Sequence, residues 1–375
     1  MDEDDMSWTE LGQRIAEARR VARLSQEQLG QPLGLDRSAI SRIESGGRTV
    51  DTLELSRLAA TLERPVEWFV GPRPVKVVSR KAARDERDTT TGDLALEDLA
   101  ADVGLLLELG LLGEIAGRRP ARKGPFRSVA DAERLARAAR EAAGGEGGPV
   151  MDVIGLAERL GLLAFVLDIE GAGFDGSFAA LPDVGLALVP GDLKPGKRRF
   201  TIAHELGHHL LEDEYDVFVD DSDGRQRRES LVNALAAGLL MPGEMVRQRF
   251  GELTGAGFDP RGAALHLGCE YGVSWTALCG RLISLGLVDR AGYRQLAAVV
   301  PSRAEFLELG LRLPAEHQAP VLPGAFTRAV LRAFRARKLS EVRALEMLRG
   351  TVSAEDLPEL RTVPLDTLRS EVDRV

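Results

Sequence analysis

The chain has 375 residues, of which 44% are hydrophobic and 29% are charged, and its formal net charge is −9. This length predicts two or three domains, since a domain usually takes about 100 to 200 residues. The composition excludes a fibrous or wholly disordered chain. The acidic balance excludes a polycation that coats nucleic acid, so any contact with DNA must be local.

Features related to cellular compartment point to the cytoplasm. Cys269 and Cys279 are too few and too far apart for a disulfide framework or a thiolate zinc site, which fits a reducing compartment. The acidic start, residues 1–5, is unlike a signal peptide. The longest apolar run, residues 104–113, is far shorter than the roughly 20 residues that span a bilayer. We therefore expect a cytoplasmic protein without a membrane segment.

Residues 8–70 carry apolar side chains at helical spacing, interrupted by glycine and serine. Ser25 and Gln28 form the pattern of a capping box, which predicts the start of a helix. Residues 34–36 then predict a tight turn, in which Asp36 caps the next helix. The segment therefore predicts a small helical domain with two helices joined by a glycine turn.

The second of these helices has an apolar side with Ile40 and Ile43. Its polar side carries Arg37, Ser38, Ser41 and Arg42. Such a pair of helices fits the major groove of DNA. The stretch from Leu11 to Phe69, above all LSQEQLGQPLGLDRSAISRIESGGRTV, resembles lambda-repressor-like helix-turn-helix domains.

This resemblance implies a double-stranded DNA operator as a partner. Base edges would be read by Arg37, Ser38 and Arg42, and the sugar-phosphate backbone would be contacted by Gln26 and Ser41. Residues 1–75 hold ten arginines against thirteen acidic residues, so a single copy would bind weakly. We therefore expect a homodimer on a two-fold site.

The helix that begins at Ser25, before the glycine turn, departs from the family pattern. It carries Gly30 and Pro32 at positions where relatives usually have helix-forming residues. Proline removes a backbone donor from a helix interior. We therefore expect this helix to be shortened or bent at its end.

A polar linker over residues 75–92 precedes an apolar helix at residues 94–115. The helix carries one apolar stripe, formed by Leu96, Leu99, Val103 and Leu106. The stripe either packs on its own domain or forms a dimer contact.

The rest of the chain is predicted to be mainly helical, with three short strands in its middle. The expected strands are residues 162–169, 174–181 and 184–189. The expected helices are residues 128–143, 151–161, 229–240, 243–252, 260–270, 274–286, 325–337 and 339–349.

Three of the five histidines fall within residues 204–209, which read His-Glu-Leu-Gly-His-His. On a helix, His204 and His208 lie on one face and can bind one cation together. Glu205 lies next to the first histidine and can reach a water held by the metal as general base. About 0.01 accidental matches to this spacing are expected in a chain of this composition. His209 points to another face, and we expect it to be a neighbour rather than a ligand.

A catalytic zinc site usually takes a third protein ligand. Spacing alone leaves eight candidates open: Glu212, Asp213, Glu214, Asp216, Asp220, Asp221, Asp223 and Glu229. His266 and His317 are isolated, and we interpret them as ordinary surface or packing residues.

The stretches RRFTIAHELGHHLLED and RESLVNALAAGLLMP resemble ImmA/IrrE-type metallo-endopeptidases over about residues 128–300. The resemblance implies that Glu229 is the third ligand, beside His204 and His208, and that Asn233 matches an Asn of the pattern. Val232 and Leu235 replace the usual Ala and Phe, which changes volume but not chemistry. The implied metal is Zn²⁺, with another divalent metal such as Mn²⁺ as the alternative. The segment from Phe178 to Val189 could supply a strand edge for a peptide.

Together these patterns predict a mainly α, multi-domain chain. A five-helix helix-turn-helix domain spans residues 8–72, and a linker with an apolar helix spans 73–127. An α+β zincin-like metallopeptidase domain with a small sheet spans 128–300, and a helical C-terminal module spans 301–375.

The leading hypothesis is a DNA-binding transcriptional regulator with a zinc-dependent endopeptidase that cleaves a repressor-type protein in a stress or mobile-element response. A first alternative is a transcription factor whose metallopeptidase-like domain only senses a ligand or metal. The intact Glu205 argues against this, since a sensor needs no general base. A second alternative is a peptidase whose N-terminal helices bind a protein, which leaves Arg37 and Arg42 without a purpose.

Overall fold

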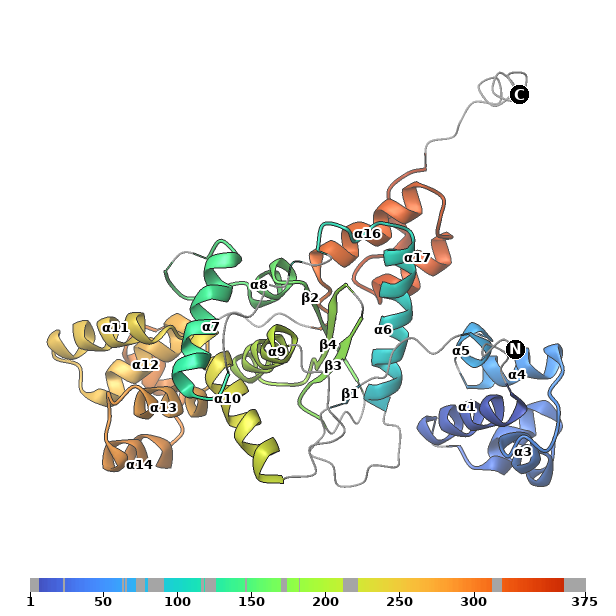
Figure 1. The fold of residues 1–375 in the computed structure, drawn as a ribbon, viewed down its shortest axis with the longest axis horizontal. Coiled ribbons are helices and arrows are strands. Elements are labelled where there is room, and N and C mark those ends of the chain that lie inside the picture. The colour runs from blue at the N-terminus through green and yellow to red at the C-terminus, as the bar shows by residue number, and fades with distance from the viewer. Residues whose placement is uncertain are drawn as a thin grey trace, which may run out of the picture.

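The structure is a computed structural model of the full chain (Figure 1). It describes residues 7–360 except 23, 63, 65, 72–77, 80–90, 116–117, 119–125, 146, 170–173, 182, 212–221 and 312–318. His317 and six of the eight candidates for a third ligand, Glu212 to Asp221, lie outside the described residues, as does the side chain of Asp223. No helix within the described ranges is long and apolar enough to cross a membrane.

The N-terminal domain consists of short helices that share one apolar core. They are α1 (Trp8–Val21), α2 (Gln26–Gly30), α3 (Arg37–Glu44), α4 (Thr52–Thr61) and α5 (Val66–Val70). Ile15, Leu29, Ile40 and Leu58 are completely buried in this core. The side chains that cap the first four helices are Ser7, Ser25, Asp36 and Asp51. The expected five helices and the predicted caps of α2 and α3 are confirmed.

Helix α2 has only five residues, which confirms the expected shortening. The chain continues as a 3-10 turn, η1 (Gln31–Leu33), with Pro32 in its first positions, and then as Gly34 at φ 70°. Gly30 is also required by packing, because a Cβ there would lie 2.3 Å from the carbonyl oxygen of Leu35.

The central sheet has the strand order β1-β3-β4-β2 within the described residues. β2 (Leu162–Leu167) and β4 (Gly185–Pro190) are parallel, β3 (Ser177–Ala180) is antiparallel to β4, and β1 (Val78–Ser79) is antiparallel to β3. The three expected strands are present: β2 ends two residues before its expected end, β3 has half of its expected length, and β4 is shifted by one residue. β1 is an additional strand in the segment that we expected to form a linker. It was not predicted, because two residues are too few to show a periodic pattern.

One face of the sheet packs against the helices that build the candidate site. These are α7 (Val129–Ala142), α8 (Val153–Arg159), α9 (Pro195–Leu210) and α10 (Ser222–Leu240). The same core continues into α11 (Gly243–Gly255), α12 (Pro260–Tyr271), α13 (Trp275–Ser284) and α14 (Arg290–Ala298), and α15 (Arg303–Glu308) follows.

The opposite face of the sheet packs against α6 (Thr91–Glu108), α16 (Gly324–Arg335) and α17 (Glu341–Leu348), and a short turn, η2 (Ala354–Asp356), follows. Figure 1 shows α6 and α9 on opposite sides of the strands. The apolar stripe of α6, which includes Leu96 and Val103, is completely buried within this chain. The stripe therefore packs on its own chain, and the alternative of a dimer contact through it is not supported. β2 and β4 are buried along their whole length because both faces of the sheet are covered.

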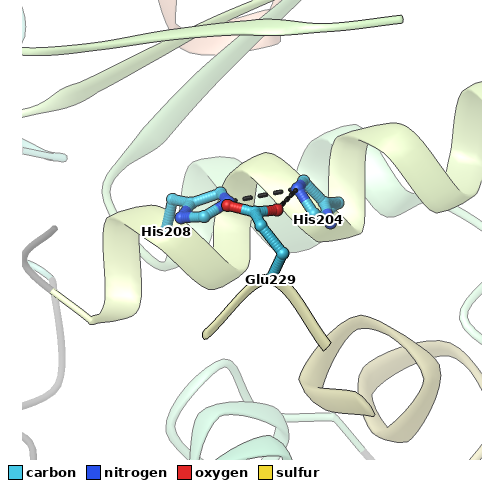
Figure 2. A group of neighbouring side chains, drawn as sticks. All are labelled: His204, His208 and Glu229. Atoms are coloured by element: carbon cyan, nitrogen blue, oxygen red, sulfur yellow. Dashed lines mark hydrogen bonds and ion pairs between the residues drawn. The ribbon is translucent and has the colours of Figure 1, made fainter. Parts of the chain in front are cut away.

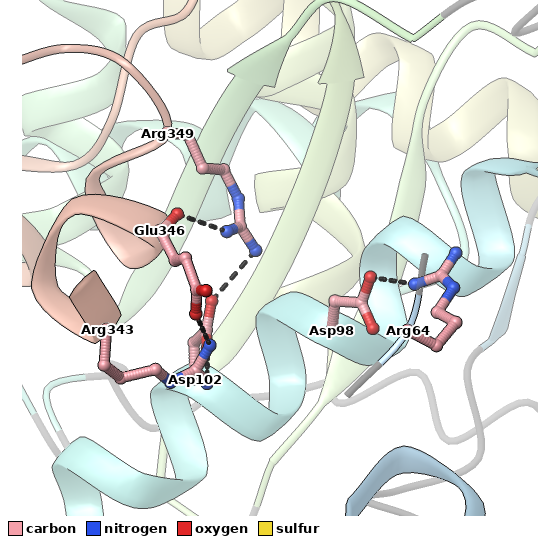
Figure 3. A network of polar contacts seen from close by, with 6 residues as sticks. All are labelled: Arg64, Asp98, Asp102, Arg343, Glu346 and Arg349. Atoms are coloured by element: carbon pink, nitrogen blue, oxygen red, sulfur yellow. Dashed lines mark hydrogen bonds and ion pairs between the residues drawn. The ribbon is translucent and has the colours of Figure 1, made fainter. Parts of the chain in front are cut away.

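Two acidic residues on α6 connect it to other parts of the chain (Figure 3). Asp102 accepts hydrogen bonds from Nη2 of Arg343 at 2.5 Å and Nη2 of Arg349 at 2.9 Å. Asp98, one turn away, pairs with Arg64, which follows α4 of the N-terminal domain. Helix α6 therefore has polar links to both the C-terminal helices and the N-terminal domain.

Candidate metal centre

Helix α9 brings His204 and His208 together one turn apart, as their spacing predicts. Their Nε2 atoms lie 3.1 Å from each other (Figure 2). The side chain of His208 is 1% exposed and that of His204 is 17% exposed. The pair is therefore mostly buried, and solvent reaches it at His204.

Helix α10 brings Glu229 to the same point. One carboxylate oxygen of Glu229 lies 3.3 Å from His204 Nε2, and the other lies 3.6 Å from His208 Nε2. The ligand atoms of these three residues all lie within 4.8 Å of one another. Of the eight candidates from the sequence, Glu229 is the one whose side chain the structure describes, and its carboxylate joins the two histidines.

The donor set and its spacing fit a divalent metal ion. Zinc bonds to imidazole nitrogen and carboxylate oxygen are about 2.0 to 2.2 Å long, so neighbouring ligands of a tetrahedral site lie roughly 3.3 to 3.5 Å apart. The three separations, 3.1, 3.3 and 3.6 Å, span this value. Within the described residues the donor set is two imidazoles and one carboxylate, the number of protein ligands that is typical of catalytic zinc sites.

Asn233, one turn after Glu229 on α10, orients one of the imidazoles. Its Oδ1 lies 3.0 Å from Nδ1 of His204. An amide oxygen only accepts hydrogen bonds, so Nδ1 carries the proton and Nε2 keeps its lone pair for a metal. The resemblance pointed to Asn233 without a role, and the structure supplies this one.

Helices α9 and α10 approach each other closely at Gly207. A Cβ at this position would lie 3.0 Å from Cγ1 of Val232. Val232 and Leu235, the two departures from the family pattern, are both completely buried here. They therefore act through packing between the two helices.

Two buried arginines fix the C-terminal end of α10, where carbonyl groups have no partner within the helix. Arg140 donates to the carbonyl oxygen of Leu239 at 2.7 Å, and Nε of Arg281 donates to that of Met241 at 2.9 Å. Arg281 also forms a two-pronged ion pair with Glu133 of α7. These contacts hold α10, and with it Glu229, in place against α7.

Glu205 lies on the sheet side of α9 and is 2% exposed. The backbone of Gly176, just before β3, passes close to it, because a Cβ at Gly176 would lie 2.7 Å from Oε1 of Glu205 and 2.6 Å from Cγ2 of Thr201. The proposed base is therefore held between the helix and the start of β3.

His209 points away from the two candidate ligands, as predicted. Its Nε2 donates to the carbonyl oxygen of Leu160 at 3.0 Å, and its ring lies beside Phe178 and is 4% exposed. His209 therefore attaches α9 to the chain between α8 and β2. His266 packs edge-to-face on Phe258, with ring centroids 4.6 Å apart.

Helix α3 places the predicted DNA-contacting residues as the sequence suggested. Ile40 and Ile43 are buried. The outward side chains, all exposed, are Arg37, Ser38, Ser41 and Arg42. The hydroxyl of Ser38 donates to Asp36 at 2.9 Å, so this side chain also supports the helix cap.

Gln26, at the start of α2, is half-buried rather than fully outward. Its Nε2 donates to Glu44 at 2.8 Å, and Glu44 is held by Arg19 at 2.6 Å. This network joins α1, α2 and α3, and it fixes the amide beside the exposed face of α3.

Comparisons with known proteins match two separate parts of the chain. Residues 15–69 match a family model described as helix-turn-helix, and residues 157–282 match a peptidase family model described as the IrrE N-terminal-like domain. The second match implies a divalent metal, in agreement with the donor set of His204, His208 and Glu229.

Two curated relatives match part of the chain. The radiation response metalloprotease IrrE of Deinococcus radiodurans is 33% identical over 97 residues, which is 24% of this chain and 27% of that protein. The protein of the same description from Deinococcus deserti is 34% identical over 90 residues, which is 22% of this chain and 30% of that protein. The matched region therefore covers less than a third of each relative.

One solved structure, Bacillus thuringiensis PlcR in complex with the peptide PapR7 and DNA, aligns over 98% of both chains at 12% identity. Its TM-score of 0.19 is too low to support any argument about the fold. From the family models and the relatives, this chain carries an XRE-type helix-turn-helix domain at its N-terminus and, behind it, an IrrE-like metallopeptidase-family domain.

Proposed function

We propose that this protein is a DNA-binding transcriptional regulator with a zinc-dependent endopeptidase that cleaves a repressor-type protein in a stress or mobile-element response. One observation carries the proposal: the ligand atoms of His204, His208 and Glu229 lie within 4.8 Å of one another, with Glu205 adjacent in the helix. The description of the two relatives as radiation response metalloproteases supports both the peptidase activity and the link to stress.

In this proposal His204, His208 and Glu229 hold the zinc ion, and Asn233 keeps His204 in the tautomer that can bind it. When bound, the ion supplies Lewis-acid polarisation of the scissile carbonyl and makes a water molecule more acidic. Glu205 accepts a proton from the attacking water and returns it to the leaving amine. The burial of Glu205 keeps bulk water away from this proton transfer.

The DNA-binding part of the proposal rests on the exposed face of α3. Arg37, Ser38 and Arg42 would read base edges of the operator, while Ser41 and Gln26 would contact its backbone. A homodimer would place two such helices on successive major-groove segments. The DNA-binding domain would thereby hold the peptidase near proteins that are bound at the same promoter.

Glu205→Gln tests the peptidase proposal, because it preserves the shape of the side chain and removes its basicity. We expect the variant to retain about one equivalent of zinc and to cleave its protein target at least about 100-fold more slowly. Zinc content is measured by elemental analysis, and cleavage by gel electrophoresis and mass spectrometry of the fragments.

Glu252→Gln, which alters an exposed glutamate on α11, serves as the matched control and should retain both properties. Cleavage at the wild-type rate by Glu205→Gln would remove Glu205 from the role of base. A wild-type protein that binds zinc and cleaves nothing would favour a sensor instead.

A further inference from the structure

Strand β3 has an outer edge that begins beside the proposed general base. β4 lies between β3 and β2, whereas β3 lies between β4 and the two-residue strand β1. The outer edge of β3 is the one that faces away from β4. The residue just before β3 is Gly176, whose backbone passes close to Glu205. We expected residues 178–189 to supply an edge that binds a peptide. In this segment the outer edge of β3 begins next to the candidate centre.

An extended peptide can bind a protein by adding a strand to such an edge, because its backbone groups then replace the missing hydrogen-bond partners. At β3 another strand already pairs with the start of this edge. Val78 pairs with Phe178 and Ser79 pairs with Ser177, in antiparallel orientation. The chain's own β1 therefore takes the two positions of β3 that lie nearest Gly176.

The cover that β1 provides is short. Within the part of the chain that the structure describes, β1 has two residues, and they pair with Ser177 and Phe178 of β3. A ladder of this length contributes few hydrogen bonds, each of modest net strength. A longer peptide that paired along all of β3 would therefore make more backbone contacts than β1 does.

β1 also has an advantage over any free peptide, because it is part of the same chain. It begins eight residues after α5 ends and lies before α6 starts at Thr91. A segment tethered in this way acts at an effective concentration in the millimolar range. Weak pairing is thus sufficient to keep the edge covered until a competing peptide is present.

We propose that β1 is an intramolecular occupant of the peptide-binding edge of β3, so that a peptide substrate gains access to the candidate centre only by displacing it. This inference rests on the proposed peptidase function. β1 thereby acts as an internal competitor for substrate at the edge of β3.

The proposal is tested with the full-length, zinc-loaded chain and the double variant Val78→Pro/Ser79→Pro. Proline has no backbone N–H and cannot form a regular strand ladder. We expect the Michaelis constant for a fluorogenic extended-peptide library to fall about fivefold to tenfold, with little change in kcat. Two controls should match the wild type: Val78→Ala/Ser79→Ala, which retains both N–H groups, and Asp85→Pro, which places proline in the same inter-helix segment outside β1.

A second readout does not depend on catalysis. Amide hydrogen exchange in the fragment covering residues 174–181 should accelerate in the proline variant and remain slow in both controls. An unchanged Michaelis constant, or wild-type exchange in the proline variant, would overturn the proposal. If no form of the protein cleaves any peptide while exchange still accelerates only in the proline variant, the peptidase function fails but the cover of β3 by β1 stands.

Discussion

The hydrogen bond from His204 to Asn233 determines which ring nitrogen can bind a metal. Because Nδ1 of His204 donates to Asn233, its Nε2 is left with a lone pair 3.1 Å from Nε2 of His208. Both imidazoles thus present a ring nitrogen to the same point, as shared coordination of one cation requires.

His208 and His209 are adjacent in sequence but have different environments, which gives a sharp test. His208→Ala removes a candidate ligand, and we expect the variant to lose most of its zinc. His209→Ala removes the hydrogen bond to Leu160, and we expect it to keep about one equivalent of zinc and to lose stability by about 1 to 3 kcal/mol. Elemental analysis and thermal unfolding of both variants measure these outcomes. Unchanged zinc content in His208→Ala would refute the ligand assignment.

Arg42 provides the corresponding test on the DNA-binding face. Arg42→Ala should weaken binding to an operator selected with the wild-type protein by about 1 to 3 kcal/mol, and should weaken binding to random DNA by less at the same salt concentration. Arg57→Ala, which alters an exposed arginine on α4, is the matched control. Fluorescence anisotropy titrations compare the variants. An equal loss on both DNA molecules would make Arg42 a phosphate contact.

At the scale of elements, α6 combines a buried apolar stripe with two acidic residues that link separate parts of the chain. Asp102 is 3% exposed, and its arginine partners Arg343 and Arg349 are 38% and 21% exposed. A carboxylate buried to this extent requires its charged partners, since removal of one side of a buried pair leaves an uncompensated charge. The position of α17 against α6 is therefore specified by polar contacts as well as by the shared core.

Burial raises the pKa of Asp102 above its ordinary value of 3.8, although Arg349 and Arg343 oppose the shift. The native state therefore binds this proton more readily than the unfolded chain does. The contribution of Asp102 to the free energy of unfolding therefore increases as the pH falls from neutral, through the raised pKa, toward 3.8. We expect the stability of the wild type relative to Asp102→Asn to rise over this range, as measured by urea unfolding at several pH values.

Asp131 provides a control of opposite sign. The backbone N–H of Arg127, together with hydrogen bonds from Arg134 and Ser128, holds the pKa of Asp131 well below its usual range. The stabilisation by Asp131 is present above the unfolded-state pKa and is lost as the pH falls, so the wild type should lose its advantage over Asp131→Asn in acid. A trend in the same direction for both variants would contradict the assigned environments.

At the scale of the whole molecule, the sequence predicted best what depends on local spacing. His204, Glu205 and His208 lie within one turn of one helix, so a periodic pattern was sufficient to place them. The caps of α2 and α3 were found for the same reason. Glu229 lies 21 residues beyond His208, and only the resemblance to a family singled it out from the other acidic residues.

Features that depend on contacts between distant parts of the chain were harder to predict from the sequence. The pairing of β1 with β3 joins Val78 to Phe178, and two residues without a repeating pattern carry no signal for it. The polar links of α6 likewise join Asp102 to Arg343, which lies 241 residues later. The apolar stripe of α6 predicted burial but could not identify what covers it, because many partners satisfy the same pattern.

A metal ion held jointly by α9 and α10 is the central feature of the proposed function. Anomalous X-ray diffraction at the zinc absorption edge, from crystals of the zinc-loaded chain, measures this directly. We predict one strong peak about 2.0 to 2.2 Å from Nε2 of His204, Nε2 of His208 and a carboxylate oxygen of Glu229. The absence of a peak at this point, or a zinc ion bound only by residues elsewhere, would contradict the account.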